Sequence, residues 1–100
     1  EHYEIAVNLN NLAAIYQEQE RFAESEDHYL RALAIKEKIF DAGNVEIALT
    51  LNNLAVLYQA QERDDEAAVL LRRALPIFER TLADDHPHLV ACRENLADLP

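Results

Sequence analysis

The sequence has one glycine, three prolines and one cysteine, and it has no methionine or tryptophan. A single glycine excludes a glycine-rich phosphate-binding loop, because such a loop needs several residues that let the backbone approach the phosphates. So few glycines and prolines leave few places for turns. Because half of the residues are hydrophobic, we predict an ordered chain dominated by helices. The lone cysteine, Cys92, excludes an internal disulfide.

Basic residues are also scarce. Lysine and arginine number 9 against 19 aspartates and glutamates, which gives a formal charge of −10. A field of this sign repels nucleic acid and anionic lipid surfaces, so we expect neither as a partner. Most acidic side chains are expected to solvate outer helix faces, and the other reading is a selectivity for neutral or basic partners.

Long apolar runs are missing as well. The longest stretch without a charged residue, 47–61, contains threonine, asparagine and glutamine. It is shorter than the roughly 20 apolar residues that cross a bilayer, so no membrane span is predicted. The first residues show no basic cluster ahead of an apolar block, so we expect no secretory signal. Together with the lone Cys92, this favours a cytoplasmic location.

What the sequence does contain is an internal repeat. The segment 9–13 reads Leu-Asn-Asn-Leu-Ala and recurs 42 positions later at 51–55, and 93–97 reads Arg-Glu-Asn-Leu-Ala. A fixed period in this range indicates stacked units that bury their apolar faces against their neighbours. We divide the single domain, 1–100, into repeat 1 (1–42), repeat 2 (43–84) and a partial repeat or capping helix (85–100), and expect a fragment of a longer array.

Each full repeat contains two apolar stripes with the 3.6-residue spacing of a helix. The first stripe consists of Ile5, Leu9, Leu12, Ala13 and Tyr16 in repeat 1, and of Ile47, Leu51, Leu54, Ala55 and Tyr58 in repeat 2. Short polar breaks between the stripes predict antiparallel helix pairs. We predict five helices, over 4–18, 22–40, 45–60, 64–82 and 87–98. Gly43 can close the second helix in a left-handed conformation, while Asn44 and Pro87 suit the starts of the third and fifth.

The order of these residues resembles the tetratricopeptide repeat. The matching positions are Leu12, Ala13, Tyr16, Ser25, Tyr29 and Ala32 in repeat 1, then Leu54, Ala55, Tyr58, Ala67, Leu71 and Ala74 in repeat 2, with Leu96 and Ala97 opening the third. The period of 42 in place of the usual 34 or so, and the linker 85–87, Asp-His-Pro, are similar to the kinesin light chain type.

The resemblance implies an all-α fold, a right-handed α-solenoid of antiparallel helix pairs. In the turn within each pair the family usually has glycine, and here Glu20 and Glu62 stand at that place. If these two residues are left-handed, each costs about 1–2 kcal/mol.

The resemblance also implies a binding surface on the concave side of the array, where the first helix of each pair lies. The inner-face positions it implies are Val7, Asn10, Asn11, Ala14, Gln17, Leu49, Asn52, Asn53, Val56, Gln59, Ala91, Glu94, Asn95 and Asp98. Because an amide both donates and accepts, Asn11, Asn53 and Asn95 could bond to the backbone of an extended peptide. The alternative is that these amides bond to neighbouring helices and tune packing.

Members of the family that bind chaperones clamp a terminal carboxylate with lysine and arginine beside this asparagine. None of the inner-face positions here is basic, which disfavours such a clamp. We therefore expect a protein or peptide partner that is neutral or basic rather than acidic, with apolar anchors against Val7, Leu49 and Val56.

The sequence offers little for catalysis or metal binding. His86 and His88 lie in a linker without further matched ligands, so linker and capping roles are predicted in place of a metal site. Cys92 has no fixed histidine partner and is predicted to be a small buried apolar group. We predict neither enzyme activity nor a cofactor. Three functions stay open: a peptide-binding scaffold, a unit that forms homo-oligomers through its array ends, and a regulatory domain of a larger signalling protein.

Overall fold

The computed structural model describes residues 2–100, so Glu1 of the predicted domain lies outside the described residues. The chain forms five helices: α1 (His2–Glu18), α2 (Phe22–Ile39), α3 (Val45–Ala60), α4 (Asp64–Thr81) and α5 (Pro87–Ala97). Residues 2–100 contain no strand. All five predicted helices are present, and the largest difference in their bounds is at the start of α1.

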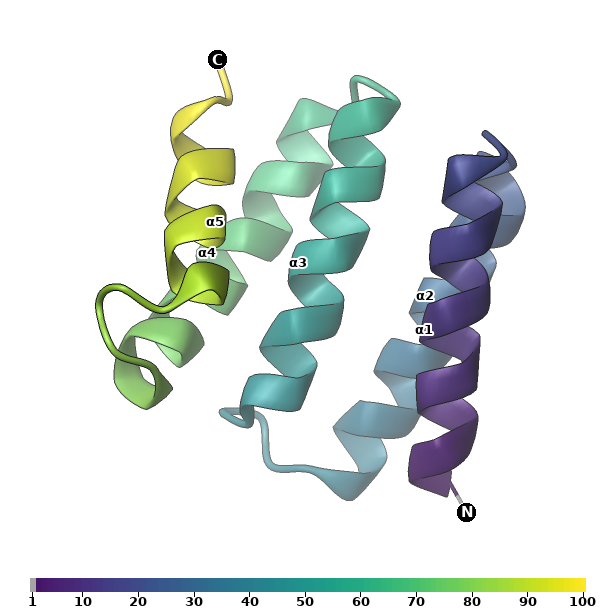
Figure 1. The fold of residues 1–100 in the computed structure, drawn as a ribbon, viewed down its shortest axis with the longest axis horizontal. Coiled ribbons are helices and arrows are strands. Elements are labelled where there is room, and N and C mark those ends of the chain that lie inside the picture. Colours follow the sequence, from purple (N-terminus) through teal and green to yellow (C-terminus); the bar gives the residue numbers. More distant parts are fainter. Residues whose placement is uncertain (1) are drawn as a thin grey trace.

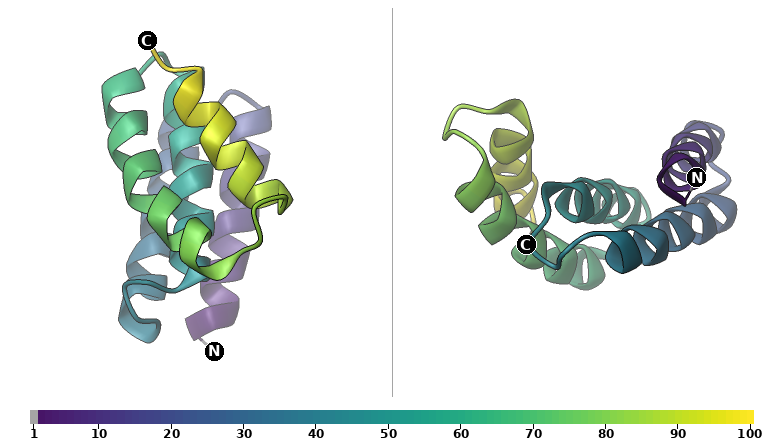
Figure 2. Two further views of the ribbon diagram at one scale, coloured as in Figure 1. Left: turned by 90° about the vertical axis from the view of Figure 1, so that its left-hand side faces the viewer. Right: turned by 90° about the horizontal axis from the view of Figure 1, so that it is seen from below.

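The helices form two layers that curve together. In Figure 1, α1, α3 and α5 form the front layer, with α2 and α4 behind them. Seen from below, the layers make an arc with α1, α3 and α5 on the inner side and α2 and α4 on the outer side (Figure 2). The start of α1 and the end of α5 lie at opposite ends of the molecule (Figure 1). This arrangement confirms the predicted array of helix pairs.

Two helix starts follow from the residues that cap them. At α3, the side-chain oxygen of Asn44 accepts a hydrogen bond of 2.8 Å from the backbone N–H of Glu46. At α5, Pro87 occupies the first turn, and Nδ1 of His86 accepts a 3.1 Å bond from the N–H of His88. Both pair a free helix N–H group with a side-chain acceptor, as predicted.

The turns within the two helix pairs are built alike. Glu20 and Glu62 both have φ of 60°, so both stand in the left-handed conformation for which the family usually has glycine. In each turn the chain then folds back, and a backbone N–H, that of Arg21 or Arg63, donates a 2.8 Å bond to the carbonyl of the tyrosine five residues before it. Both turns therefore carry the same local strain.

The prediction for Gly43 is wrong, because no glycine has a positive φ. Helix α2 instead ends at Ile39 and is followed by Phe40, whose extended backbone donates its N–H to the carbonyl of Lys36. Gly43 provides room for Arg80 of α4. The guanidinium of Arg80 donates a 2.8 Å bond to the Gly43 carbonyl and would crowd a Cβ at this position. The glycine is used for a close approach of α4 to the linker.

The core is centred on α3. Four of its buried side chains are Ile47, Leu51, Leu54 and Leu57. They pack in one cluster with residues of all four other helices, among them Ala13, Tyr29, Leu33, Leu71, Phe78 and Leu89. A helix that is covered on several sides must be apolar around much of its circumference. This explains why the uncharged stretch of the sequence coincides with α3.

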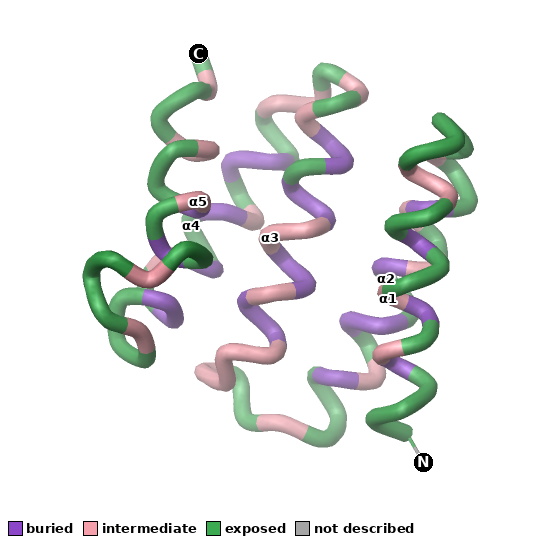
Figure 3. The backbone as a smooth tube through the Cα atoms, in the orientation of Figure 1, coloured by how far each residue is buried: buried purple, intermediate pink, exposed green. Residues whose placement is uncertain are grey.

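The predicted burial of the first stripe is wrong for part of repeat 1. Leu9 and Ala13 are buried, but Ile5 and Leu12 are 48% and 43% exposed. Figure 3 shows α1 largely exposed along its front, whereas along α3 buried positions alternate with less buried ones. The reason is that α1 packs mainly against α2, while α3 packs against both α2 and α4.

Candidate peptide-binding groove

The predicted inner-face residues all lie on α1, α3 and α5, or directly after α5 in the case of Asp98, along the inner side of the arc (Figure 2). Five are exposed, namely Asn11, Ala14, Val56, Glu94 and Asp98. Nine are partly buried, namely Val7, Asn10, Gln17, Leu49, Asn52, Asn53, Gln59, Ala91 and Asn95. None of the set is fully buried, so each keeps surface that a ligand could reach.

Some of the amides in this set connect neighbouring helices. Nδ2 of Asn53 on α3 donates to Oδ1 of Asn10 on α1 over 3.5 Å, which is a long bond. Nε2 of Gln59 donates a 3.2 Å bond to the backbone carbonyl of Asn95 on α5. For Asn53 this contact agrees with the packing alternative, whereas the exposed Asn11 leaves its amide in solvent. The structure does not bring Asn11, Asn53 and Asn95 into contact with one another.

One amide oxygen of the inner-face set, on α3, is buried without a hydrogen-bond partner among residues 2–100. Oδ1 of Asn52 is buried, and no group within residues 2–100 donates a hydrogen bond to it. Leaving a buried acceptor unpaired costs about 1–3 kcal/mol.

The charge of the inner-face residues differs from one helix to the next. Asn10, Asn11 and Asn53 are uncharged, whereas the α5 end carries the exposed carboxylates Glu94 and Asp98. None of the inner-face residues is basic. Within the inner-face set, the negative charge therefore lies at the α5 end.

A buried lysine joins α2 to α3, the middle helix of the inner layer. Nζ of Lys36 donates to Oγ1 of Thr50 at 2.9 Å and to the carbonyl of Glu46 at 3.3 Å. It also lies 3.2 Å from the Glu46 carboxylate. These three acceptors match the three donors of an ammonium group, so the buried charge is both paired and hydrogen-bonded.

A second polar junction joins the other end of α2 to the turn between α3 and α4. The Glu26 carboxylate accepts 2.8 Å bonds from the Tyr58 hydroxyl and from the Arg63 guanidinium. The Arg63 guanidinium also lies over the Tyr58 ring, 4.0 Å from its centroid. Hydrogen bonding from Arg63 holds the pKa of Glu26 below its ordinary value of 4.5. Burial, assisted by the bond to Glu26, raises the pKa of Tyr58 to about 12.

The residues considered for catalysis or metal binding have structural contacts. Cys92 is fully buried, and burial raises the pKa of its thiol to about 11, which fits the predicted small apolar group. His86 caps α5, and its ring stacks on that of His88. Across residues 2–100, no group of three or more His, Cys, Asp or Glu side chains could hold a metal ion. Over the same residues, no helix is long and apolar enough to cross a membrane.

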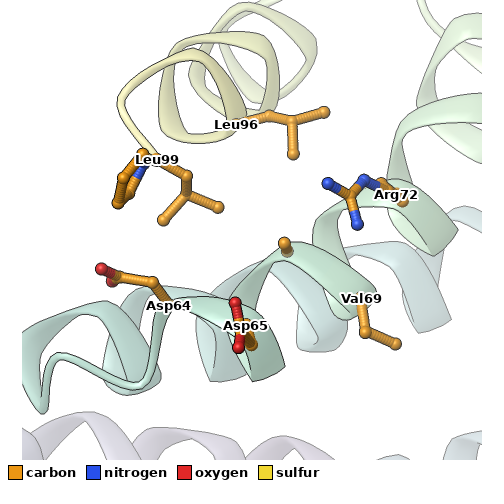
Figure 4. A pocket seen from close by; sticks show the side chains of 8 residues that line it. Asp64, Asp65, Val69, Arg72, Leu96 and Leu99 are labelled. Carbon is orange, nitrogen blue, oxygen red and sulfur yellow. The ribbon is translucent and has the colours of Figure 1, made fainter.

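The sequence did not predict a cleft of about 540 Å³ between α4 and the end of the chain. Figure 4 shows Leu96 and Leu99 on one side and Asp64, Asp65 and Arg72 on the other. A comparison of equivalent positions in the repeats could have indicated this cleft. Two lining residues, Ala68 and Pro100, stand at the positions of Glu26 and Tyr58, which are in contact at the α2–α3 junction. The cleft lies where that junction has no counterpart.

Stacked helix pairs with an accessible inner face define a helical-repeat scaffold. A family model of the tetratricopeptide repeat matches residues 4–80 and 46–99. The chain therefore belongs to the tetratricopeptide repeat family, as the spacing of its residues predicted. Repeats of this family generally mediate protein–protein interaction.

Solved structures confirm the kinesin light chain-like type of the repeat. The chain is similar to a candidate kinesin light chain from Podosopora anserina with nearly identical TPR-like repeats, with 27% identity and a TM-score of 0.84. A variant of that protein gives 25% identity and a TM-score of 0.85. The match covers 92% of this chain but only 44% and 43% of those chains. No curated protein matches the sequence.

Proposed function

We propose that the chain binds an extended segment of a partner protein in the groove lined by α1, α3 and α5, and that this segment is neutral or basic. The observation that carries the proposal is the composition of the inner face, where amides stand beside partly exposed apolar side chains and no residue is basic. Amides can bond to the main chain of a ligand, and Val7, Leu49 and Val56 offer apolar surface to its side chains. The carboxylates near α5 disfavour an acidic ligand.

The geometry refines the roles of the three asparagines. Asn11 is exposed and has its amide available, whereas Asn53 must exchange its long bond to Asn10 for a bond to the ligand. Asn52 has a buried oxygen without a donor, so its side chain would have to turn outward before it could accept from a ligand. We therefore assign main-chain recognition to the amides of α1 and α3 together, with Asn95 extending it toward α5.

Short labelled peptides of one apolar pattern, with lysine, glutamine or glutamate at the polar positions, test this assignment by fluorescence anisotropy. The lysine and glutamine forms should bind more tightly than the glutamate form. Replacing Asn11, Asn53 and Asn95 together with alanine should weaken binding at least about tenfold, because each lost bond contributes about 1 kcal/mol. The control is Asn8→Ala, an exposed asparagine of α1 outside the groove set. Equal binding by the triple variant, or a preference for the glutamate peptide, would contradict the proposal.

The same proposal covers the setting of the interaction. A net charge of −10 supports a protein partner over nucleic acid or membrane, and the lone buried cysteine fits the reducing cytoplasm. We further propose that the chain itself has no catalytic role. Imaging of the tagged protein in cells tests the location, and an extracellular signal would contradict it.

A further inference from the structure

The exposed side of α1 repeats the surface by which α3 docks on α2. Ile5, Leu12 and Ile15 stand one period before Ile47, Leu54 and Leu57. The first three side chains are 48%, 43% and 50% exposed, and their counterparts are 0%, 1% and 0% exposed. We call the exposed surface the N-terminal face and include in it Glu4, Asn8, Tyr16 and Arg21, whose counterparts also contact α2 or the turn that follows α3.

One end of the N-terminal face reproduces the acceptors of the buried lysine. At the α2–α3 junction, Glu46 and Thr50 accept from the ammonium of Lys36. One period earlier stand Glu4 and Asn8, and both are exposed. A carboxylate and an amide oxygen are both acceptors for an ammonium group. This end of the face is therefore suited to a lysine presented by another helix.

The other end reproduces the donors that hold Glu26. The Arg21 guanidinium lies over the Tyr16 ring at 4.5 Å, as that of Arg63 lies over Tyr58 at 4.0 Å. Arg21 also bonds Glu24 through Nε at 2.8 Å, as Arg63 bonds Glu66.

Only one partner of this arrangement is missing at the N-terminal face. Arg63 additionally holds Glu26 of another helix, and within residues 2–100 no carboxylate from another helix bonds to Arg21. The Arg21 side chain is correspondingly 49% exposed, against 29% for Arg63. Tyr16 and Arg21 thus form a preorganised receptor for a carboxylate.

We propose that the N-terminal face docks a helix pair of the same repeat type whose second helix has the chemistry of α2. The docked helix presents a carboxylate to Tyr16 and Arg21, an ammonium group to Glu4 and Asn8, and apolar side chains to Ile5, Leu12 and Ile15. Its two charged groups are spaced as Glu26 and Lys36 are in α2. This docking surface is separate from the peptide groove.

A second copy of this chain does not supply that chemistry. Its Glu26 and Lys36 are already bonded to its own α3 and the turn beyond. In α4, the residues at the corresponding positions are Ala68 and Phe78, which offer neither charge. The occupant is therefore a unit of the α2 type, and a dimer of this chain is the competing outcome.

Two extended proteins test the proposal, one with residues 1–42 and one with residues 43–84 joined in register before the full chain. With 1–42 added, we expect one cooperative unfolding transition with a midpoint above those of the parent chain and of the other extension. A separate transition for the added unit, or equal stabilisation by both extensions, would overturn the proposal. Sedimentation of the parent chain provides a further check. A dimer that disappears with Ile15→Lys would assign the face to a second copy and overturn it as well.

Double-mutant cycles then test each polar end. In the extended protein, Glu26→Gln in the added unit is combined with Arg21→Gln in the original chain, and Lys36→Met in the added unit with Glu4→Gln. Each pair should be coupled, so that the second substitution lowers the midpoint less once the first is present. Because Arg21 and Glu4 are exposed, their single variants keep the parent fold. Additive effects in both cycles would refute the assigned contacts.

Discussion

Repeat 1 and repeat 2 carry the same apolar pattern in different surroundings. Leu12 and Leu54 are the same residue at the same place in the repeat, yet their exposures are 43% and 1%. The helices that carry them have the same secondary structure and the same turns. The difference teaches that burial in an array is a property of the neighbouring units, whereas helix bounds and turns are properties of the unit itself.

The largest expected effect comes from truncating these two leucines. Leu54→Ala should lower the free energy of unfolding by about 2–5 kcal/mol, because it opens a cavity in a packed core. Leu12→Ala should cost less than about 1 kcal/mol, because its side chain is already partly in water. Urea unfolding followed by circular dichroism measures both. Similar losses at the two positions would mean that α1 is covered in solution.

Lys36 is a charged residue at a place in the repeat where repeat 2 has an apolar one. Repeat 2 has Phe78 there, and both residues are buried. Lys36→Met keeps most of the stem but leaves Thr50 and Glu46 without their donor, so we expect a loss of about 1–3 kcal/mol. Lys38→Met, on an exposed position of the same helix, should stay within about 0.5 kcal/mol of wild type. Equal unfolding midpoints for the two variants would contradict the assigned role.

The carboxylate of Glu26 joins repeat 1 to repeat 2, and the stability it contributes should depend on pH. Glu26→Gln should cost about 1–2 kcal/mol near neutral pH, since a charge-assisted bond to Arg63 is replaced by a neutral one. The folded pKa of Glu26 lies below its ordinary value of 4.5. Its contribution is therefore complete above that value and is lost as the pH falls through the folded pKa.

Unfolding titrations of the wild type and Glu26→Gln at several pH values test this dependence. The difference between them should shrink as the pH falls from about 5 toward about 3. The control Asp27→Asn removes a neighbouring exposed carboxylate and should shift stability by no more than about 0.5 kcal/mol. A gap that stays constant with pH would exclude an ionised Glu26 as its cause.

Local patterns predicted most of the fold. The cap at Asn44 and the place of Pro87 at the start of α5 follow from residues within one turn of the chain. The left-handed turns at Glu20 and Glu62 were raised only as a possibility, through the resemblance to a family that usually has glycine there. Gly43 escaped prediction because the helix before it ends with extended backbone, and the glycine instead makes room for Arg80 from α4. Such a contact joins residues far apart in sequence, and no local spacing encodes it.

The candidate site could be placed by helix but not in its contacts. The resemblance to the tetratricopeptide repeat implied that the first helix of each pair faces inward, and the inner-face residues lie on α1, α3 and α5 or directly after α5. The sequence could not show that Asn53 turns toward Asn10, or that Asn52 keeps a buried unpaired oxygen. Those details depend on how α3 sits between its neighbours, which is set by Lys36 and Glu26 across the repeat boundary.

The smallest expected effect is also the one that should be equal in both repeats. Glu20 and Glu62 share φ of 60°, and each is exposed. Replacing either with glycine relieves the crowding of its Cβ but raises the entropy of the unfolded chain, so the net gain should be about 0.5–1 kcal/mol. Unlike the leucine pair, the two turns should respond alike, because their strain is contained within a few residues. Thermal unfolding of Glu20→Gly and Glu62→Gly should give matching increases in Tm, and a gain in only one repeat would show that neighbouring units also shape the turn.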